Sequence, residues 1–174
     1  MPLKNGEYDS CSFVDCDFSE SSLKEIHFVD CLFTRCNLSM AGLYKTSFHD
    51  VEFHDCKMLG IRFEDCNNFG LSFSFHNCIL DHSSFYRLNI KRSVFRNSRL
   101  QEVDFTECNL GLSVFHNCDL QAAVFVHTVL EGVDFRTAVN FSIDPEINKM
   151  KNAFFSIQNL PGLLNKYELR ISHE

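Results

Sequence analysis

The sequence contains no tryptophan, only three prolines and no long apolar run. No segment approaches the roughly 20 consecutive apolar residues of a membrane helix, and the opening MPLKNGEYDSCSF lacks the apolar core of a signal peptide. Basic side chains are also in deficit, because 16 of them stand against 23 acidic ones, a formal net charge of −7. We therefore expect a soluble acidic protein of the cytoplasm that binds neither membranes nor nucleic acid directly.

Apolar residues recur at every fifth position through most of the chain. The series restarts two residues out of phase after a weak member at Asn68, which predicts a bulge over residues 67–73. The centres of the repeats are Phe13, Phe18, Leu23, Phe28, Phe33, Leu38, Leu43, Phe48, Phe53, Met58 and Phe63, then Phe75, Leu80, Phe85, Ile90, Phe95, Leu100, Phe105, Leu110, Phe115, Leu120, Phe125, Leu130 and Phe135.

The position two before each centre is restricted to small or apolar side chains, and the remaining three positions are mostly polar. An odd number of cysteines without an export signal argues against a disulfide framework. All nine occupy the restricted position: Cys11, Cys16, Cys31, Cys36, Cys56, Cys66, Cys78, Cys108 and Cys118. Two inward and three outward residues per five indicate a coil with a narrow filled interior.

This pattern resembles the pentapeptide-repeat proteins. The resemblance implies an all-β solenoid, a right-handed quadrilateral β-helix with four repeats per coil. Taking every fourth centre gives phenylalanine at each level of one side, from Phe13 to Phe135, as expected if coils stack at the strand spacing. We expect about six coils over residues 1–138.

Residues 139–174 depart from the repeat and are expected to form a short α-helical cap. Asp144 before Pro145 is a typical helix start. We predict helices over residues 145–153 and 160–166 and a strand over residues 167–171. The apolar residues exceed the needs of one end cap, so they are predicted to form a homodimer interface; they are Phe154, Phe155, Ile157, Leu160, Leu163, Leu164, Leu169 and Ile171.

Three side-chain groups have simple interpretations. The column Cys16, Cys36, Cys56 and Cys78 is expected to be core packing, because stacked thiols do not converge as zinc ligands do.

His54, His76 and His116 share a column with Arg96 and Arg136, and a solvated polar ladder is favoured over a metal or catalytic site. The basic run of Arg87, Lys91, Arg92, Arg96 and Arg99 spreads over all four sides and favours a solvated band over a nucleic-acid patch. We predict no enzyme activity, cofactor or metal.

Acidic residues are uneven along the chain. Residues 1–70 carry 12 acids and 6 bases, a net of −6. The second side of the coil has a local excess of acids. Two explanations of this charge are open: it keeps the protein soluble, or it lets the acidic rod occupy a protein site built for DNA. Composition alone favours solubility.

A narrower resemblance concerns the segments AVNFSIDPEIN and LLNKYELRI, with CKMLG and CILDHSSFY. They are similar to the topoisomerase-protecting branch of the family, the Qnr-type quinolone-resistance, microcin-immunity and albicidin-resistance proteins. That resemblance implies a dimeric DNA mimic that binds DNA gyrase or topoisomerase IV and protects it from a quinolone or peptide toxin. For this role we predict that outward acids present carboxylates in place of phosphates and that two bulge residues touch the enzyme; they are Asp15, Asp17, Glu20, Asp55, Asp81, Glu102 and Asp119, with Phe69 and Leu71. The chain lacks the longer loops of many Qnr-type proteins. The alternative is a generic protein-interaction scaffold.

Overall fold

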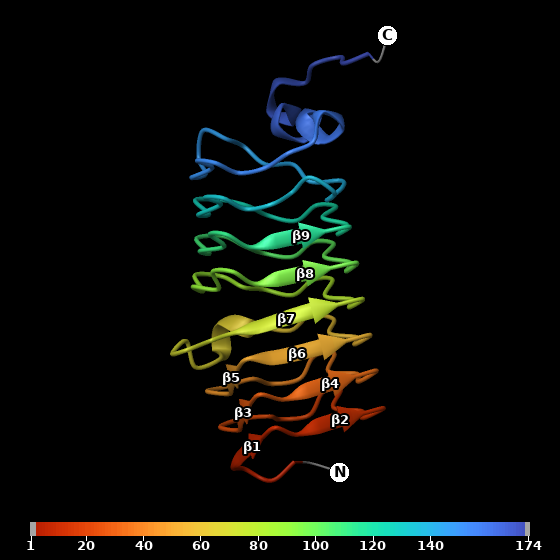
Figure 1. Cartoon of the computed structure of the whole chain (residues 1–174), viewed down its shortest axis with the longest axis vertical. Coiled ribbons are helices and arrows are strands. Elements are labelled where there is room, and N and C mark those ends of the chain that lie inside the picture. The colour runs from red at the N-terminus through yellow and green to blue at the C-terminus, as the bar shows by residue number, and fades with distance from the viewer. Residues whose placement is uncertain (1–2, 173–174) are drawn as a thin grey trace.

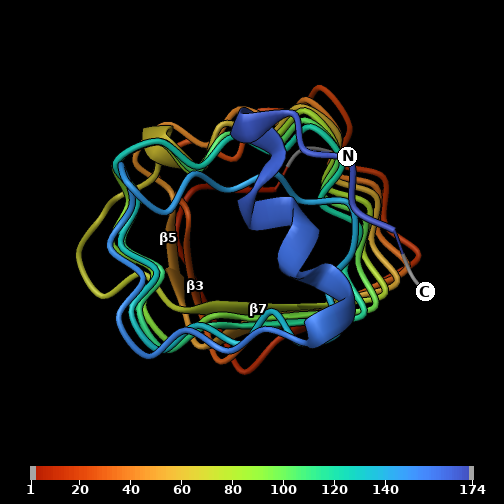
Figure 2. The ribbon, with the colours of Figure 1, turned by 90° about the horizontal axis from the view of Figure 1, so that it is seen from above.

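The computed structural model describes residues 3–172 and shows a parallel β-solenoid whose coils pile into a rod (Figure 1). Viewed along the rod, the coils superpose on a four-sided outline (Figure 2). This arrangement confirms the solenoid predicted from the five-residue period. Within these residues no helix is long and apolar enough to cross a membrane.

Two parallel sheets cover adjacent sides of the rod. The first contains β1 (Glu7–Asp9), β3 (His27–Val29) and β5 (Ser47–His49). The second runs further along the rod through β2 (Ser12–Val14), β4 (Leu32–Thr34), β6 (Val51–His54), β7 (Phe73–His76), β8 (Val94–Arg96) and β9 (Val114–His116). The other two sides are held by isolated parallel bridges, so most backbone groups bond to the next coil without forming long strands.

The chain turns a corner after each repeat by placing one residue in the left-handed region. Positive φ values recur every five residues, as at Asp15, Glu20 and Glu25, with φ of 54°, 55° and 58°. Most of these residues are not glycine. The left-handed conformation is sterically unfavourable for them, and least so for Asn and Asp. The period of five is therefore a backbone requirement as well as a packing pattern.

Phenylalanine rings fill the rod in a continuous stack. Phe53 and Phe75 lie 5.3 Å apart between ring centroids at an interplanar angle of 10°, and Phe95 and Phe115 lie 4.8 Å apart at 3°. Phenylalanines of adjacent sides meet these rings edge to face, as Phe85 meets Phe95 at 87°. Ring pairs of these geometries add to the stabilisation from burial.

The restricted small position has a hydrogen-bonding role. The Cys36 thiol donates to the carbonyl oxygen of Phe13 in the preceding coil, at 3.4 Å. Thr46 and Thr128 make the same contact with their hydroxyls at 2.8 and 2.9 Å. A small side chain with a weak or strong donor fits this place, which explains why cysteines gather there as free thiols.

The two-residue insertion lies where the sequence predicts it. Strand pairing steps by 20 residues from Phe33 to Phe53, by 22 from Phe53 to Phe75, and by 20 again to Phe95. A short 3₁₀ helix, η1 (Phe63–Asp65), leads into the bulge. The phenylalanine stack continues unbroken across it.

The C-terminal predictions are partly wrong. Residues 145–153 form no helix but continue the solenoid, since Lys149 pairs with Val129 and Phe154 with Asp134. Phe155 stacks on Phe135 at 5.4 Å, so the coil extends beyond residue 138. The cap is 3₁₀-helical rather than α-helical, with η2 (Ile157–Leu163) and η3 (Asn165–Tyr167). Residues 168–171 form no strand, because Glu168 takes a left-handed conformation that ends η3.

Candidate partner-binding surface

Stacked apolar side chains fill the interior of the described coils, so the chemistry of the solenoid lies on the outward positions of each coil. Five of the predicted acids are exposed there: Asp15, Asp17, Glu20, Asp55 and Glu102. Asp17 accepts a hydrogen bond from the Ser19 hydroxyl, and Glu102 lies 3.3 Å from the His82 ring. These side chains can present carboxylates to a partner.

Asp15 is exposed but paired. Its two carboxylate oxygens accept hydrogen bonds from Arg35 of the next coil at 2.7 and 2.8 Å. This bidentate contact lowers the pKa of Asp15 below its usual value and neutralises its charge locally. Asp15 and Asp55 share one corner column, and Arg35 stands between them, which divides any negative stripe there.

The prediction that Asp81 presents its carboxylate to a partner is wrong. Its residue is only 5% exposed, and its carboxylate accepts hydrogen bonds from Arg99 Nε at 2.7 Å and from the Gln101 backbone at 3.2 Å. Asp119, half-buried, is similarly engaged by Asn140 and Gln101. Partial burial opposes ionisation of Asp119, yet these hydrogen bonds prevail and its pKa is lowered. Both acids tie coils together.

A group of acids that the sequence analysis did not single out lies on the N-terminal coils. We call Glu7, Asp9, Asp30 and Asp50 the acidic corner. Glu7 and Asp9 are in β1, while Asp30 and Asp50 follow β3 and β5 in equivalent positions, one coil apart. All four are exposed, and none forms a salt bridge with another side chain of residues 3–172. Asp30 and Asp50 are 20 residues apart, which is one coil, so this spacing in the sequence could have placed the two acids in the same column.

Some basic residues of the middle coils form ion pairs with neighbouring side chains. Arg87 forms a bidentate contact with Glu107 at 2.8 and 3.1 Å, and Arg99 holds Asp81. Lys91, Arg92 and Arg96 remain exposed. The distribution fits the solvated band expected from the sequence. Arg92 lines the same surface hollow as Asp50, so a basic side chain borders the acidic corner toward the later coils.

The bulge exposes one of its two predicted contact residues. Phe69 is 82% exposed at the tip, whereas Leu71 is half-buried and packs against the core. Gly70 has φ of +66°, and a Cβ there would lie 2.9 Å from His49 Nε2. The loop is held close to the rod by a contact of 3.0 Å between His49 Nε2 and the Phe69 carbonyl. Phe69 is thus a single apolar contact point beside acidic coils.

The cap presents a largely apolar surface at the far end of the rod. Of the residues predicted for a dimer interface, Phe155 and Leu163 pack against the core and Leu164 is half-buried. The others are exposed, Ile157 at 83%: Phe154, Ile157, Leu160, Leu169 and Ile171. An exposed group of this kind is typical of an interaction site.

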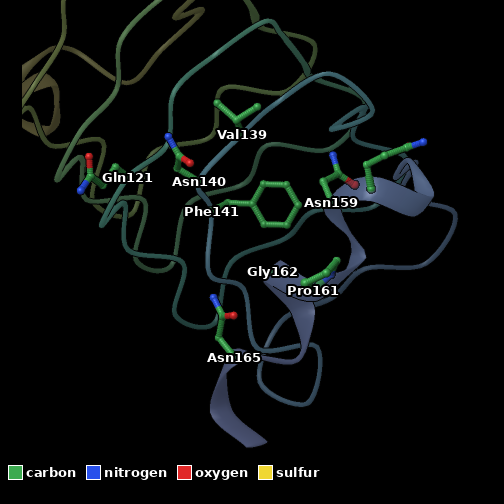
Figure 3. A pocket seen from close by; sticks show the side chains of 9 residues that line it. Gln121, Val139, Asn140, Phe141, Asn159, Pro161, Gly162 and Asn165 are labelled. Atoms are coloured by element: carbon green, nitrogen blue, oxygen red, sulfur yellow. The ribbon is translucent and has the colours of Figure 1, made fainter. Parts of the chain in front are cut away.

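An open cleft of about 630 Å³ lies between the last coil and η2 (Figure 3). Val139, Asn140 and Phe141 line one wall, and Pro161 and Gly162 the other. Asn159 fastens η2 by donating to the carbonyls of Phe135 and Ala138 at 2.7 and 3.2 Å. The cleft has no convergent acid, base or nucleophile and serves as the seam between solenoid and cap.

The predicted columns of cysteine and histidine are both present. Cys36, Cys56 and Cys78 are buried and Cys16 is half-buried, as expected for core packing. Burial is the main cause of the raised pKa of the Cys118 thiol, about 12, so it stays protonated and unreactive. His54 and His76 point outward and stack at 4.5 Å. The pKa of His76 is lowered, first by partial burial and then by His54.

Comparisons with known proteins agree with this geometry. The sequence profile described as the pentapeptide repeat region matches residues 7–74 and 71–139. No curated protein sequence matches the chain. Among solved structures, a trypsin-treated variant of QnrB1, a plasmid-mediated fluoroquinolone resistance protein, superposes with a TM-score of 0.63 at 15% identity, covering 97% of this chain and 92% of that one. Full-length QnrB1 gives 0.61 at 15% identity, covering 94% and 90%.

Proposed function

This chain belongs to the pentapeptide-repeat family, and we propose that it is a non-enzymatic cytoplasmic protein that binds a type II topoisomerase, DNA gyrase or topoisomerase IV, as a DNA mimic. In this role it protects the enzyme from a quinolone or a peptide toxin. The observation that carries the proposal is the acidic corner: exposed carboxylates that form no salt bridge within residues 3–172, on successive coils of a rod that shares the QnrB1 fold over nearly its whole length.

The charge pattern restricts where the partner docks. Coils stack at the strand spacing of roughly 4.8 Å, so carboxylates on neighbouring coils form a dense negative edge that attracts a basic DNA-binding groove. Asp17, Glu20 and Asp55 are exposed on the same coils but lie on other sides and corners of the rod, so they do not lengthen the acidic corner. Asp81 and Asp119 do not belong to it, because their carboxylates are engaged within the rod.

Reversing charge at the acidic corner tests this surface. We expect the Asp30→Lys/Asp50→Lys variant to lose topoisomerase binding by at least about tenfold, because two repulsive charges replace two attractive ones. Binding is measured by surface plasmon resonance on immobilised gyrase, and protection by a supercoiling assay with and without a fluoroquinolone. The matched control is Glu107→Lys/Glu131→Lys, which changes the net charge equally at two exposed acids of later coils that are not assigned to the contact surface. Equal binding by both variants and the unaltered protein would contradict DNA mimicry.

A generic interaction scaffold is the second candidate. It is favoured by the ion pairs Asp15–Arg35 and Arg87–Glu107, which interrupt the negative surface outside the acidic corner. If the unaltered protein has no effect on gyrase or topoisomerase IV at micromolar concentration, this candidate replaces the first.

A further inference from the structure

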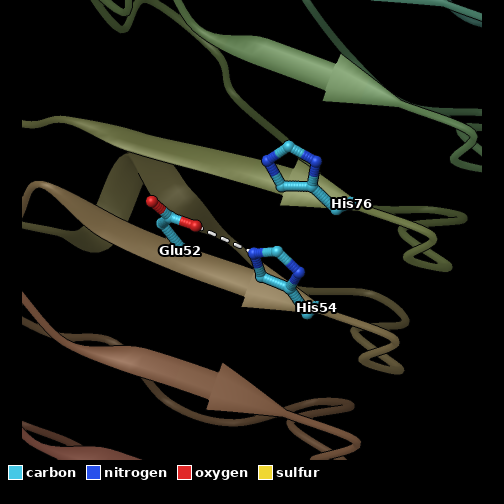
Figure 4. A group of neighbouring side chains, drawn as sticks. All are labelled: Glu52, His54 and His76. Carbon is cyan, nitrogen blue, oxygen red and sulfur yellow. Dashed lines mark hydrogen bonds and ion pairs between the residues drawn. The ribbon is translucent and has the colours of Figure 1, made fainter.

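Three metal-binding side chains converge on the outer face of the second sheet (Figure 4). Glu52 and His54 lie two apart on β6 and therefore point to the same face. His76 on β7 is the direct pairing partner of His54. The two imidazole rings stack at 4.5 Å and 18°, and Glu52 Oε2 lies 2.8 Å from His54 Nε2.

We propose that Glu52, His54 and His76 form a binding site for a divalent transition-metal ion of the zinc type. Each residue offers one ligand atom, and these atoms lie within 4.8 Å of one another. Zinc bonds to histidine nitrogen and carboxylate oxygen are about 2.0–2.2 Å long, so tetrahedral ligands sit about 3.4 Å apart. Metal binding therefore requires the Glu52 and His54 side chains to rotate, and both are exposed enough to do so.

The chemistry of the donor set selects the ion. Two imidazoles with one carboxylate suit zinc, nickel and copper, whereas magnesium and calcium prefer oxygen ligands alone. Three protein ligands leave a fourth position open. A water molecule, or a side chain of a bound partner, completes the coordination there.

The site is specific to one place on the rod. The same column carries Thr34 in the preceding coil and Arg96 in the following coil, and neither residue is a ligand for such an ion. Leu32 and Ser74 flank Glu52 in its column. Across residues 3–172 no second group of three metal-binding side chains comes as close together.

One feature of the surroundings opposes binding. Arg96 pairs with His76 in the register of β7 and β8, and its positive charge repels a cation. Arg96 is exposed, however, so solvent and salt screen this repulsion, and the Glu52 carboxylate compensates for part of it. We expect moderate affinity rather than the tight binding of a closed structural zinc site.

Metal binding would connect the two coils on either side of the insertion. The register between β6 and β7 is where the repeat steps by 22 residues instead of 20. A metal bridging these strands binds only the folded state and therefore raises its stability. The proposal is independent of any role in binding a topoisomerase.

The test uses the full chain without a histidine tag, stripped with a chelator and then titrated with Zn²⁺ against a chromophoric competitor. We expect one equivalent at micromolar affinity, with a rise in the thermal midpoint. His76→Asn and Glu52→Gln should each weaken binding by at least about tenfold. The matched control is His116→Asn, which removes a histidine from the same column at a position outside the cluster.

A second measurement separates this site from the cysteines. The histidine ring signals of His54 and His76 should shift on Zn²⁺ addition in NMR spectra, while that of His127 stays unchanged. Zn²⁺ binding of equal affinity and stoichiometry in His54→Asn/His76→Asn would overturn the proposal, because the thiols would then be the ligands. Absence of binding in the unaltered protein would overturn it as well.

Discussion

At the scale of single residues, the repeat satisfies two demands at once. The residue two before each centre is small because its donor reaches a carbonyl of the preceding coil, as Cys36 and Thr46 do. The residue two after each centre bears a positive φ, as Asp15 does. The sequence predicts the first demand through its cysteines. It conceals the second, because acids at left-handed corners look like ordinary surface charge.

Asp81 shows how an acid at an apparently outward position can be structural. Replacing it with alanine removes the acceptor for Arg99 Nε and for the Gln101 backbone. We expect Asp81→Ala to lower the free energy of unfolding by about 1–3 kcal/mol, since the half-buried Gln101 N–H and the Arg99 guanidinium both lose their acceptor. The measurement is a urea titration followed by circular dichroism.

The matched control for Asp81 is Glu20→Ala, which changes an exposed acid. We expect that control to stay within about 0.5 kcal/mol of the unaltered protein. Equal stability of the two variants would contradict a structural role for Asp81.

At the scale of elements, the sequence predicts the solenoid well and its end poorly. The period of five specifies coil register even across the insertion, because each phenylalanine must stack on the next. At residues 145–153 the capping signal of Asp144 and Pro145 competes with tertiary pairing, and the pairing of Lys149 with Val129 prevails. Local helix signals are weak when an exposed coil edge offers a full set of backbone partners.

The attachment of η2 depends on the close approach of Gly162 to the last coil. Its carbonyl accepts a hydrogen bond from the Ile143 backbone at 2.9 Å, and a Cβ there would lie 2.6 Å from the Phe141 carbonyl oxygen. We expect Gly162→Ala to lower stability by about 1–3 kcal/mol and to release the cap. Hydrogen exchange should then accelerate at η2 and η3 while the solenoid stays protected.

Gly42→Ala provides the control for this effect, because a Cβ at Gly42 would meet open space. Its exchange pattern should match that of the unaltered protein. Unchanged protection of η2 in Gly162→Ala would show that the seam is looser than its contacts indicate.

At the scale of the whole molecule, charge and apolar surface lie at opposite ends. The acidic corner occupies the first coils, while the exposed apolar residues of the cap lie at the other end (Figure 1). The sequence predicted the acidic half from its net charge, but only the folded register shows which carboxylates are free. A pairing of two caps would place two acidic rods end to end, each with its corner at a tip.

The exposed apolar residues of the cap predict a dimer. We expect the unaltered protein to sediment as a dimer and Ile157→Glu/Leu160→Glu to sediment as a monomer, because both side chains are exposed in one chain and a charge would be buried between two. Analytical ultracentrifugation provides the measurement, and a thermal melt verifies the fold. Met40→Glu is the control, since Met40 is an exposed apolar residue on an early coil, far from the cap. Persistence of the dimer in the double variant would remove the cap from the interface. If the unaltered protein and the double variant are both monomers, the dimer prediction is wrong, and a partner binds a single rod through its acidic end.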